Sequence, residues 1–161
     1  MCNQANAAAN GRVAVKGKTM EVRVTHEGNA RFQIQARQHV IVSDQPLDNG
    51  GDDAAMTPPE LFLASIGSCV AYYAAQFLKS RKLSLEGLEV TVQAEKLREP
   101  ARLGNFIIQV KTPASLTEDQ TLAMDRTVHR CLIHQTMQHV PSIEIEIFSD
   151  VPAAEAVVDV V

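Results

Sequence analysis

Two cysteines are the residues of this sequence with the most specific chemistry: Cys69, in the run GSCVAYY, and Cys131, in the run VHRCLIH. A thiolate is a strong nucleophile that can be oxidised to a sulfenic acid or a disulfide, so two thiols that meet in the fold could carry out redox chemistry. Most unpaired cysteines are instead small buried hydrophobic residues, and the residues alone leave this alternative open. A third cysteine, Cys2, lies in a predicted flexible leader, and we expect it to be incidental.

Each of the two candidate cysteines falls in the middle of a predicted long helix. The run Thr57–Glu60 (TPPE) has a capping threonine, a proline at the first helical position and a glutamate that can close a capping box. From there the first helix is predicted to run to about Lys79. The second is predicted from about Glu118 to His139, because the residue before Pro141 disfavours helix. If these two helices face each other, they bring the thiols together.

Alternating polar and apolar residues predict the strands that surround these helices. The predicted strands are Met20–Thr25, Arg31–Ala36, His39–Ser43, Gly87–Leu97, Arg102–Lys111 and Ser142–Phe148. The first three have brief connections, which favours an antiparallel meander. The order βββ-α-ββ-α-β predicts the α+β class, with two long central helices packed on antiparallel sheets.

The same pattern predicts one domain with short extensions. Residues 1–17 are expected to be a flexible leader, residues 18–150 a single domain, and residues 151–161 a tail. Within the domain, residues 18–44 form the meander and residues 57–150 the lobe of helices and sheet. The connecting loop, residues 44–56, contains the run DNGGDD. It lacks the downstream glutamate of a calcium loop, so we expect a solvated loop that could cover the thiols.

Composition excludes several classes of function. The 161 residues carry a net charge of −4, only 4% are aromatic and none is Trp, which argues against a nucleic-acid partner. Three cysteines are too few, and odd in number, for a secreted disulfide framework. The first ten residues show no pattern of a signal peptide. A reducing cytoplasm is the expected location.

The first predicted helix is apolar on nearly all sides. The stretch Leu61–Leu78 is long enough to raise the question of a membrane span, but serines, tyrosines and a glutamine interrupt it. A buried helix in a soluble protein explains it better, and we expect no membrane partner. Because a monomer of this size has difficulty surrounding such a helix, a homodimer is the simplest expectation. Burial under the chain's own sheets is the alternative.

The histidines of the second predicted helix do not form a metal site. His129, His134 and His139 are spaced by five residues, which turns successive rings about 140° apart on a continuous helix. The i,i+4 spacing of a zinc-binding helix is absent. We therefore expect no metal.

The segment TPPELFLASIGSCVAYYAAQFLKSRKLSLEGLEVTVQAE resembles the central segment of the OsmC/Ohr superfamily, the osmotically inducible and organic-hydroperoxide-resistance proteins. The shared pattern is a Pro-Glu-Leu helix start, a run of small apolar residues, a cysteine, a following strand, and then a second helix with a second cysteine. The similarity in order and spacing extends from about Met20 to Phe148.

The resemblance implies an intertwined homodimer with two active sites at the subunit interface. It also implies a peroxidase that reduces organic hydroperoxides to alcohols. Cys69 would be the peroxidatic thiol and form a sulfenic acid, and Cys131 the resolving thiol that closes a disulfide with it. A small dithiol or a lipoylated protein would then reduce the disulfide. No metal or organic cofactor is implied.

Two departures from the family pattern concern the activation of Cys69. Hydroperoxidases of this family have a glutamate ten residues before the cysteine, where this chain has Pro59. Glu60 follows, but its spacing fits the capping box better. The family's activating arginine has no match in loop 44–56, which leaves Arg31 and Arg37 on the meander as candidates.

The second cysteine departs as well, because the family often has Cys-Pro where this chain has Cys131-Leu132. These differences resemble the less-characterised branch of the superfamily. They keep open a non-catalytic relative that binds an apolar small molecule at the dimer interface. They also leave a thiol-exchange or sulfur-transfer protein, which the absence of a CxxC motif disfavours.

Overall fold

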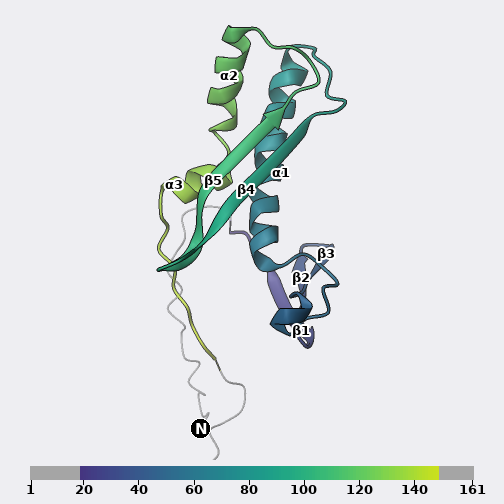
Figure 1. Cartoon of the computed structure of the whole chain (residues 1–161), viewed down its shortest axis with the longest axis vertical. Coiled ribbons are helices and arrows are strands. Elements are labelled where there is room, and N and C mark those ends of the chain that lie inside the picture. Colours follow the sequence, from purple (N-terminus) through teal and green to yellow (C-terminus); the bar gives the residue numbers. More distant parts are fainter. Residues whose placement is uncertain (1–18, 149–161) are drawn as a thin grey trace, which may run out of the picture. The chain divides into compact units, whose positions relative to one another are not determined.

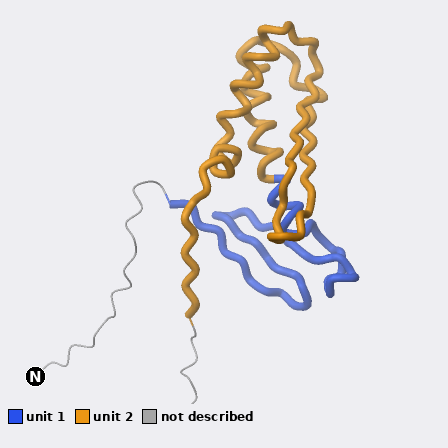
Figure 2. The backbone as a smooth tube through the Cα atoms, turned by 60° about the vertical axis from the view of Figure 1, so that its left-hand side comes forward, with its two compact units in different colours: residues 1–64 blue, residues 65–161 orange. Residues whose placement is uncertain are grey.

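The computed structural model describes residues 19–148 of the chain (Figure 1). The predicted leader, with Cys2, and the predicted tail lie outside the described residues. The chain divides into two compact units, residues 1–64 and 65–161, and the boundary falls inside the long helix α1, Pro58–Ser80 (Figure 2). Each unit has its own antiparallel sheet.

The first unit contains a three-stranded sheet in the order β1-β2-β3, which confirms the predicted meander. Its strands are β1 Arg23–Gly28, β2 Arg31–Ala36 and β3 His39–Ser43. The second and third have the predicted bounds, whereas β1 begins and ends later than predicted and has a register shift just before Gly28. Val24, Ile34 and Ile41 lie opposite one another across the three strands, so their apolar side chains share one face of this sheet.

The loop at residues 44–56 is organised around the carboxylate of Asp44, whose residue is only 1% exposed. The backbone N–H groups of Gln45, Asp52 and Ala54 donate to this carboxylate at 2.8, 3.1 and 3.1 Å. One turn of 3-10 helix, η1 Leu47–Asn49, lies within the loop. The other acidic side chains of the loop are exposed, as predicted, but the backbone around Asp44 is fixed by these bonds.

Helix α1 begins with the predicted capping box. The backbone N–H of Thr57 donates to Oε2 of Glu60 at 2.7 Å, and the N–H of Glu60 donates to Oγ1 of Thr57 at 3.4 Å. By length and composition alone the helix could cross a bilayer. In this fold it is the core helix of the second unit, with Ile66, Val70, Ala74, Phe77 and Leu78 buried.

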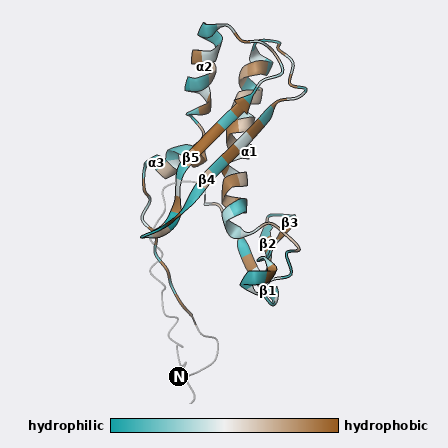
Figure 3. Ribbon diagram, in the orientation of Figure 1, coloured by the Kyte–Doolittle hydropathy of each residue, from teal (hydrophilic) through white to brown (hydrophobic). Residues whose placement is uncertain are grey.

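The second unit packs one face of a two-stranded sheet against α1. Its strands, β4 Glu89–Arg98 and β5 Ala101–Lys111, pair antiparallel close to their predicted bounds. Hydrophobic residues line α1 and β5 (Figure 3). Gly67 permits a close approach, because a Cβ atom there would lie 3.1 Å from Cγ2 of Val92 on β4. The small residue of α1 at this point thus faces the chain's own sheet.

The prediction of one continuous helix from Glu118 to His139 is wrong. The segment forms two helices, α2 Glu118–Val128 and α3 Leu132–Gln138, which point in different directions (Figure 1). Helix α2 starts at the predicted residue, where Thr117 and Gln120 form a complete capping box. The segment 127–131 contains no Gly or Pro, but threonine, valine, histidine and cysteine are all weak helix formers. The chain turns there and buries Cys131 against α1.

The predicted strand Ser142–Phe148 is not formed either. These residues have no strand assignment, and Ile143, Ile145 and Ile147 are 79%, 82% and 92% exposed. Their alternation is suited to a strand, but a strand needs the hydrogen bonds of a neighbouring edge. The described part of the chain therefore has the order βββ-α-ββ-α-α. It is an α+β fold, as predicted, with one long helix and two shorter ones.

Candidate functional site

Cys69 lies on the part of α1 that belongs to the second unit, and its side chain is partly buried. It follows Ile66 by three residues and precedes Val70, and both of these residues are in the core. Their position places Cys69 at the border of that core, where its thiol retains some exposure.

Cys131 is fully buried. It was predicted in the middle of a helix, but it lies at the N-cap of α3. Its Sγ atom accepts a hydrogen bond from the backbone N–H of His134 at 3.5 Å. Sulfur is a weak acceptor, but here it takes the place of the side-chain oxygen that usually caps a helix.

The two thiols meet within the core of the second unit. Cys131, Ile66 and Val70 form one buried cluster, and Cys69 packs against it. Cys69 is close enough to Cys131 to raise the pKa of its thiol, and both thiols are free. The sequence-based expectation that the two elements bring the thiols together is met, although the second element is a helix start instead of a helix centre.

The surroundings of Cys131 favour its protonated form. Burial is the largest cause that raises the pKa of this thiol above its ordinary value of 9.0, and the hydrogen bond with Cys69 raises it further. The N–H groups of His134 and Ile133 act in the opposite direction but are outweighed. Cys131 is therefore a neutral thiol near pH 7, whereas Cys69 is the one with access to solvent.

The residues considered for activation of Cys69 lie in the first unit. Glu60 is a capping residue, as predicted, since its Oε2 also accepts the hydroxyl of Thr57 at 2.8 Å. Arg31 on β2 lies close enough to the buried Asp44 to contribute to the lowering of that carboxyl's pKa, for which the backbone N–H of Ala54 is the largest cause. Its Nε atom is buried without a hydrogen-bond partner. Arg37 is in the turn between β2 and β3, with a φ angle of 57°.

The break before α3 brings two histidines together that a continuous helix would separate. The rings of His129 and His134 lie 4.9 Å apart with an interplanar angle of 44°. Nε2 of His129 is 3.4 Å from a carboxylate oxygen of Asp125, and Nε2 of His134 is 3.0 Å from the side-chain amide of Gln138. Among the described residues, no group of three His, Cys, Asp or Glu side chains could hold a metal ion.

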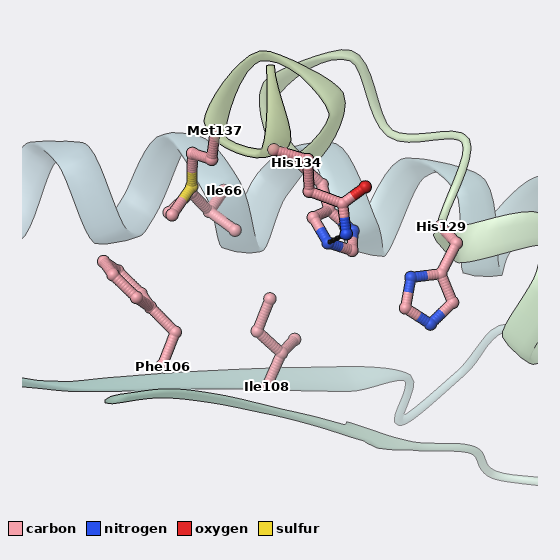
Figure 4. A pocket seen from close by; sticks show the side chains of 7 residues that line it. Ile66, Phe106, Ile108, His129, His134 and Met137 are labelled. Carbon is pink, nitrogen blue, oxygen red and sulfur yellow. Dashed lines mark hydrogen bonds between the residues drawn. The ribbon is translucent and has the colours of Figure 1, made fainter. Parts of the chain in front are cut away.

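A cavity of about 440 Å³ lies between α3, β5 and α1, next to this histidine pair. Ile66, Phe106, Ile108 and Met137 form its apolar lining, and the rings of His129 and His134 are at one end (Figure 4). A second cavity of about 280 Å³ shares Ile108 and the two histidines. We refer to the first cavity as the α3 groove. Apolar lining with a few polar groups is typical of sites for small organic molecules.

The sequence did not reveal the histidine pair or the α3 groove. Both depend on the turn at residues 129–131, and no glycine, proline or capping oxygen marks that turn. The one local signal is the run of weak helix formers before Cys131.

The chain has clear similarity to known proteins. Its residues 50–146 match the protein family described as OsmC-like protein. Among proteins with curated functions, none matches the sequence significantly.

Several solved structures share the fold. One is a protein of Psychrobacter arcticus 273-4, provisionally described as an osmotic stress induced and detoxification response protein, with a TM-score of 0.67 and 21% identity over 77% of this chain and 91% of that one. An OsmC-like protein of Mycoplasma pneumoniae has a TM-score of 0.61 and 18% identity, over 76% of this chain and 89% of that one. The organic hydroperoxide resistance protein OsmC of Legionella pneumophila has a TM-score of 0.56 and 20% identity, over 75% of this chain and 90% of that one.

Proposed function

Because the chain belongs to the OsmC-like protein family, we propose that it is a thiol-dependent peroxidase that reduces organic hydroperoxides to alcohols. The observation that carries the proposal is the packing of a partly buried cysteine, Cys69, against the core cluster that contains the buried Cys131. A relative with this fold from Legionella pneumophila is described as an organic hydroperoxide resistance protein, which supports the same substrate class.

In the first proposed step, the Cys69 thiolate attacks the distal oxygen of the hydroperoxide. A sulfur–oxygen bond forms, the oxygen–oxygen bond breaks, and the alkoxide that leaves takes up a proton to become the alcohol. The sulfur of Cys69 is oxidised by two electrons to a sulfenic acid. Cys69 has this role because its thiol is the exposed one of the pair.

In the second step, Cys131 resolves the sulfenic acid. Its sulfur attacks the sulfur of Cys69, the disulfide forms, and hydroxide leaves and combines with the proton of the Cys131 thiol to give water. The packing of the two side chains in one core cluster supports a direct disulfide. An external dithiol, either a small molecule or the lipoyl group of a partner protein, then reduces the disulfide through two exchange steps. A reducing cytoplasm is the proposed location, since it keeps both thiols reduced between turnovers.

Positive charge near Cys69 is still needed, because a mid-helix cysteine gains little from the helix dipole. Arg31 and Arg37, on the meander, are the candidates for this role. Arg31→Gln and Arg37→Gln variants compare the two directly, through the rate at which each protein is oxidised by hydroperoxide.

The active form is proposed to be a homodimer. Two observations support a second copy. The apolar side chains of residues 142–148 are exposed. In helix α1, only 28% of the most apolar stretch is buried in the single chain. A dimer interface would cover both. Sedimentation or light scattering of the full chain measures this state directly.

Consumption of cumene hydroperoxide with dithiothreitol or dihydrolipoamide as the reductant tests the proposed function. Wild-type protein is expected to consume the peroxide, and Cys69→Ala to lose this activity. Cys131→Ser is expected to form the sulfenic acid of Cys69, detectable with dimedone, without the disulfide. Equal rates for wild type and Cys69→Ala would rule out the peroxidase.

The α3 groove favours one other function, the binding of an apolar small molecule without catalysis. In that case, Cys69 would be unreactive toward a thiol reagent in the folded protein. Native mass spectrometry of the purified protein would show a retained ligand.

A further inference from the structure

Helix α3 depends on Cys131 for the order of its first turn. The helix has seven residues, and none of them is fully buried. Helices this short are unstable on their own, so caps and contacts decide whether they form. At the start of α3, the cap is the sulfur of Cys131, which accepts the N–H of His134. Partly buried Ile133 and Met137 add contacts with the core.

Cys69 on α1 packs against the core cluster to which Cys131 belongs. A disulfide would require the two sulfur atoms to approach to about 2.05 Å and would fix the dihedral angle about the new bond near 90°. The Cys131 sulfur would then be drawn toward α1 and held in a direction set by the disulfide. That movement would weaken the hydrogen bond that the sulfur accepts from the N–H of His134 at the start of α3. The cap and the disulfide thus compete for one atom.

Helix α3 is also one wall of the α3 groove. It contributes His134, Met137 and Gln138, while Ile66 of α1 and Phe106 and Ile108 of β5 line the other sides (Figure 4). His134 has two roles here, since its backbone N–H is the cap donor and its ring lines the groove. A change at the cap therefore reaches the groove through one residue.

We propose that the Cys69–Cys131 pair is a redox latch on α3: the dithiol state caps α3 and holds this wall of the groove in place, and the disulfide state loosens α3. This inference rests on the thiol pair of the proposed function. With a hydroperoxide as the oxidant, the two thiols lose two protons and two electrons, and the products are the disulfide, one alcohol and one water.

Hydrogen exchange of the reduced full-length protein tests the cap without any redox chemistry. The readout is the exchange of the peptide that covers residues 132–138, with β4 and β5 as internal references. Cys131→Ala removes the acceptor, and we expect exchange of α3 to become about fivefold faster, the factor that corresponds to the loss of an N-cap. Cys131→Ser keeps an acceptor, and exchange should remain within about twofold of wild type. Equal exchange in the two variants would overturn the proposal.

Oxidation of the wild-type protein with diamide tests the latch itself. Diamide takes two hydrogen atoms from two thiols, and so forms the disulfide without a hydroperoxide. We expect exchange of α3 to become about fivefold faster or more, while β4 and β5 are unchanged. Cys69→Ser should show no effect of diamide on α3. The proposal is overturned if the disulfide forms and α3 is not loosened, if Cys69→Ser responds like wild type, or if diamide cannot join these two thiols. Failure of the proposed function has a different signature, the absence of hydroperoxide consumption by the reduced protein.

Discussion

Cys131 is fully buried, and the partly buried Cys69 packs against the core cluster that contains it. The two members of this pair are therefore unequal. Burial, followed by the contact with Cys69, raises the pKa of Cys131, so its proton is retained at a pH at which an ordinary thiol begins to ionise. A reagent that arrives from solvent meets Cys69 first.

This inequality predicts selective alkylation of the folded protein. Iodoacetamide reacts with the thiolate. At about pH 8 we therefore expect Cys131 to be labelled more slowly than Cys69, by a factor of roughly ten or more. Peptide mass spectrometry after short exposure distinguishes the two sites from Cys2. In concentrated urea the two rates should become similar, because burial no longer protects Cys131. Faster labelling of Cys131 in the folded protein would contradict the assignment of roles.

Position 51 is expected to require glycine because there is no room for a side chain, and not because of its backbone conformation. A Cβ atom there would collide with the backbone carbonyl of Gln45 and lie 2.7 Å from the Asp44 carboxylate. We expect Gly51→Ala to lower the free energy of unfolding by about 1–3 kcal/mol, measured by urea denaturation. Gly50→Asn is the matched control: position 50 has a φ of 79° and open space, and asparagine tolerates this conformation. A similar loss in both variants would mean that the loop tolerates no substitution, whatever its size.

The buried carboxylate of Asp44 predicts a loss of stability in acid. Its pKa lies below the ordinary value of 3.8, chiefly because of the N–H of Ala54 and then that of Gln45. For a lowered pKa, the stabilising effect is complete above the pKa of the unfolded chain and is lost as the pH falls through the folded value. Asp44→Asn should therefore be less stable than wild type at neutral pH, and the difference should shrink below about pH 4. Urea midpoints of both proteins across this range measure it, and a constant difference would exclude Asp44 as the titrating group.

Glu60 offers a direct test of a structural against a catalytic role. Its Oε2 atom accepts the N–H and the hydroxyl of Thr57, and glutamine can take the same place in a capping box. We expect Glu60→Gln to keep the stability and the hydroperoxide activity of wild type, whereas Thr57→Ala should lower the free energy of unfolding by about 1 kcal/mol. Loss of activity in a stable Glu60→Gln protein would instead indicate that the carboxylate acts on the thiol site.

Local signals in the sequence predicted the elements that form from local causes. The start of α1 could be predicted because Thr57 and Glu60 satisfy each other, and β2 and β3 because polar and apolar residues alternate along them. The division between α2 and α3 could not be found in this way. It depends on the burial of Cys131 against α1, which is a tertiary contact, and a cysteine is not among the usual capping residues. The proximity of the two cysteines was expected. Their difference in burial and the pairing of His129 with His134 were not, because both follow from the division between α2 and α3.

The segment 142–148 has a strand pattern without a strand, and this mismatch predicts how the chain associates. Ile143, Ile145 and Ile147 alternate with Glu144 and Glu146, so a partner that pairs with this segment would bury the isoleucines on one side and leave the glutamates in solvent. If the partner is a second copy, Ile145→Glu should weaken the dimer by about tenfold or more, because a charge would be buried at the interface. Glu146→Gln, on the opposite side, should leave the association within about twofold of wild type. Sedimentation velocity over a range of concentrations gives both dissociation constants. If the two variants associate as the wild type does, the segment is not part of the interface, and its exposed isoleucines need another explanation.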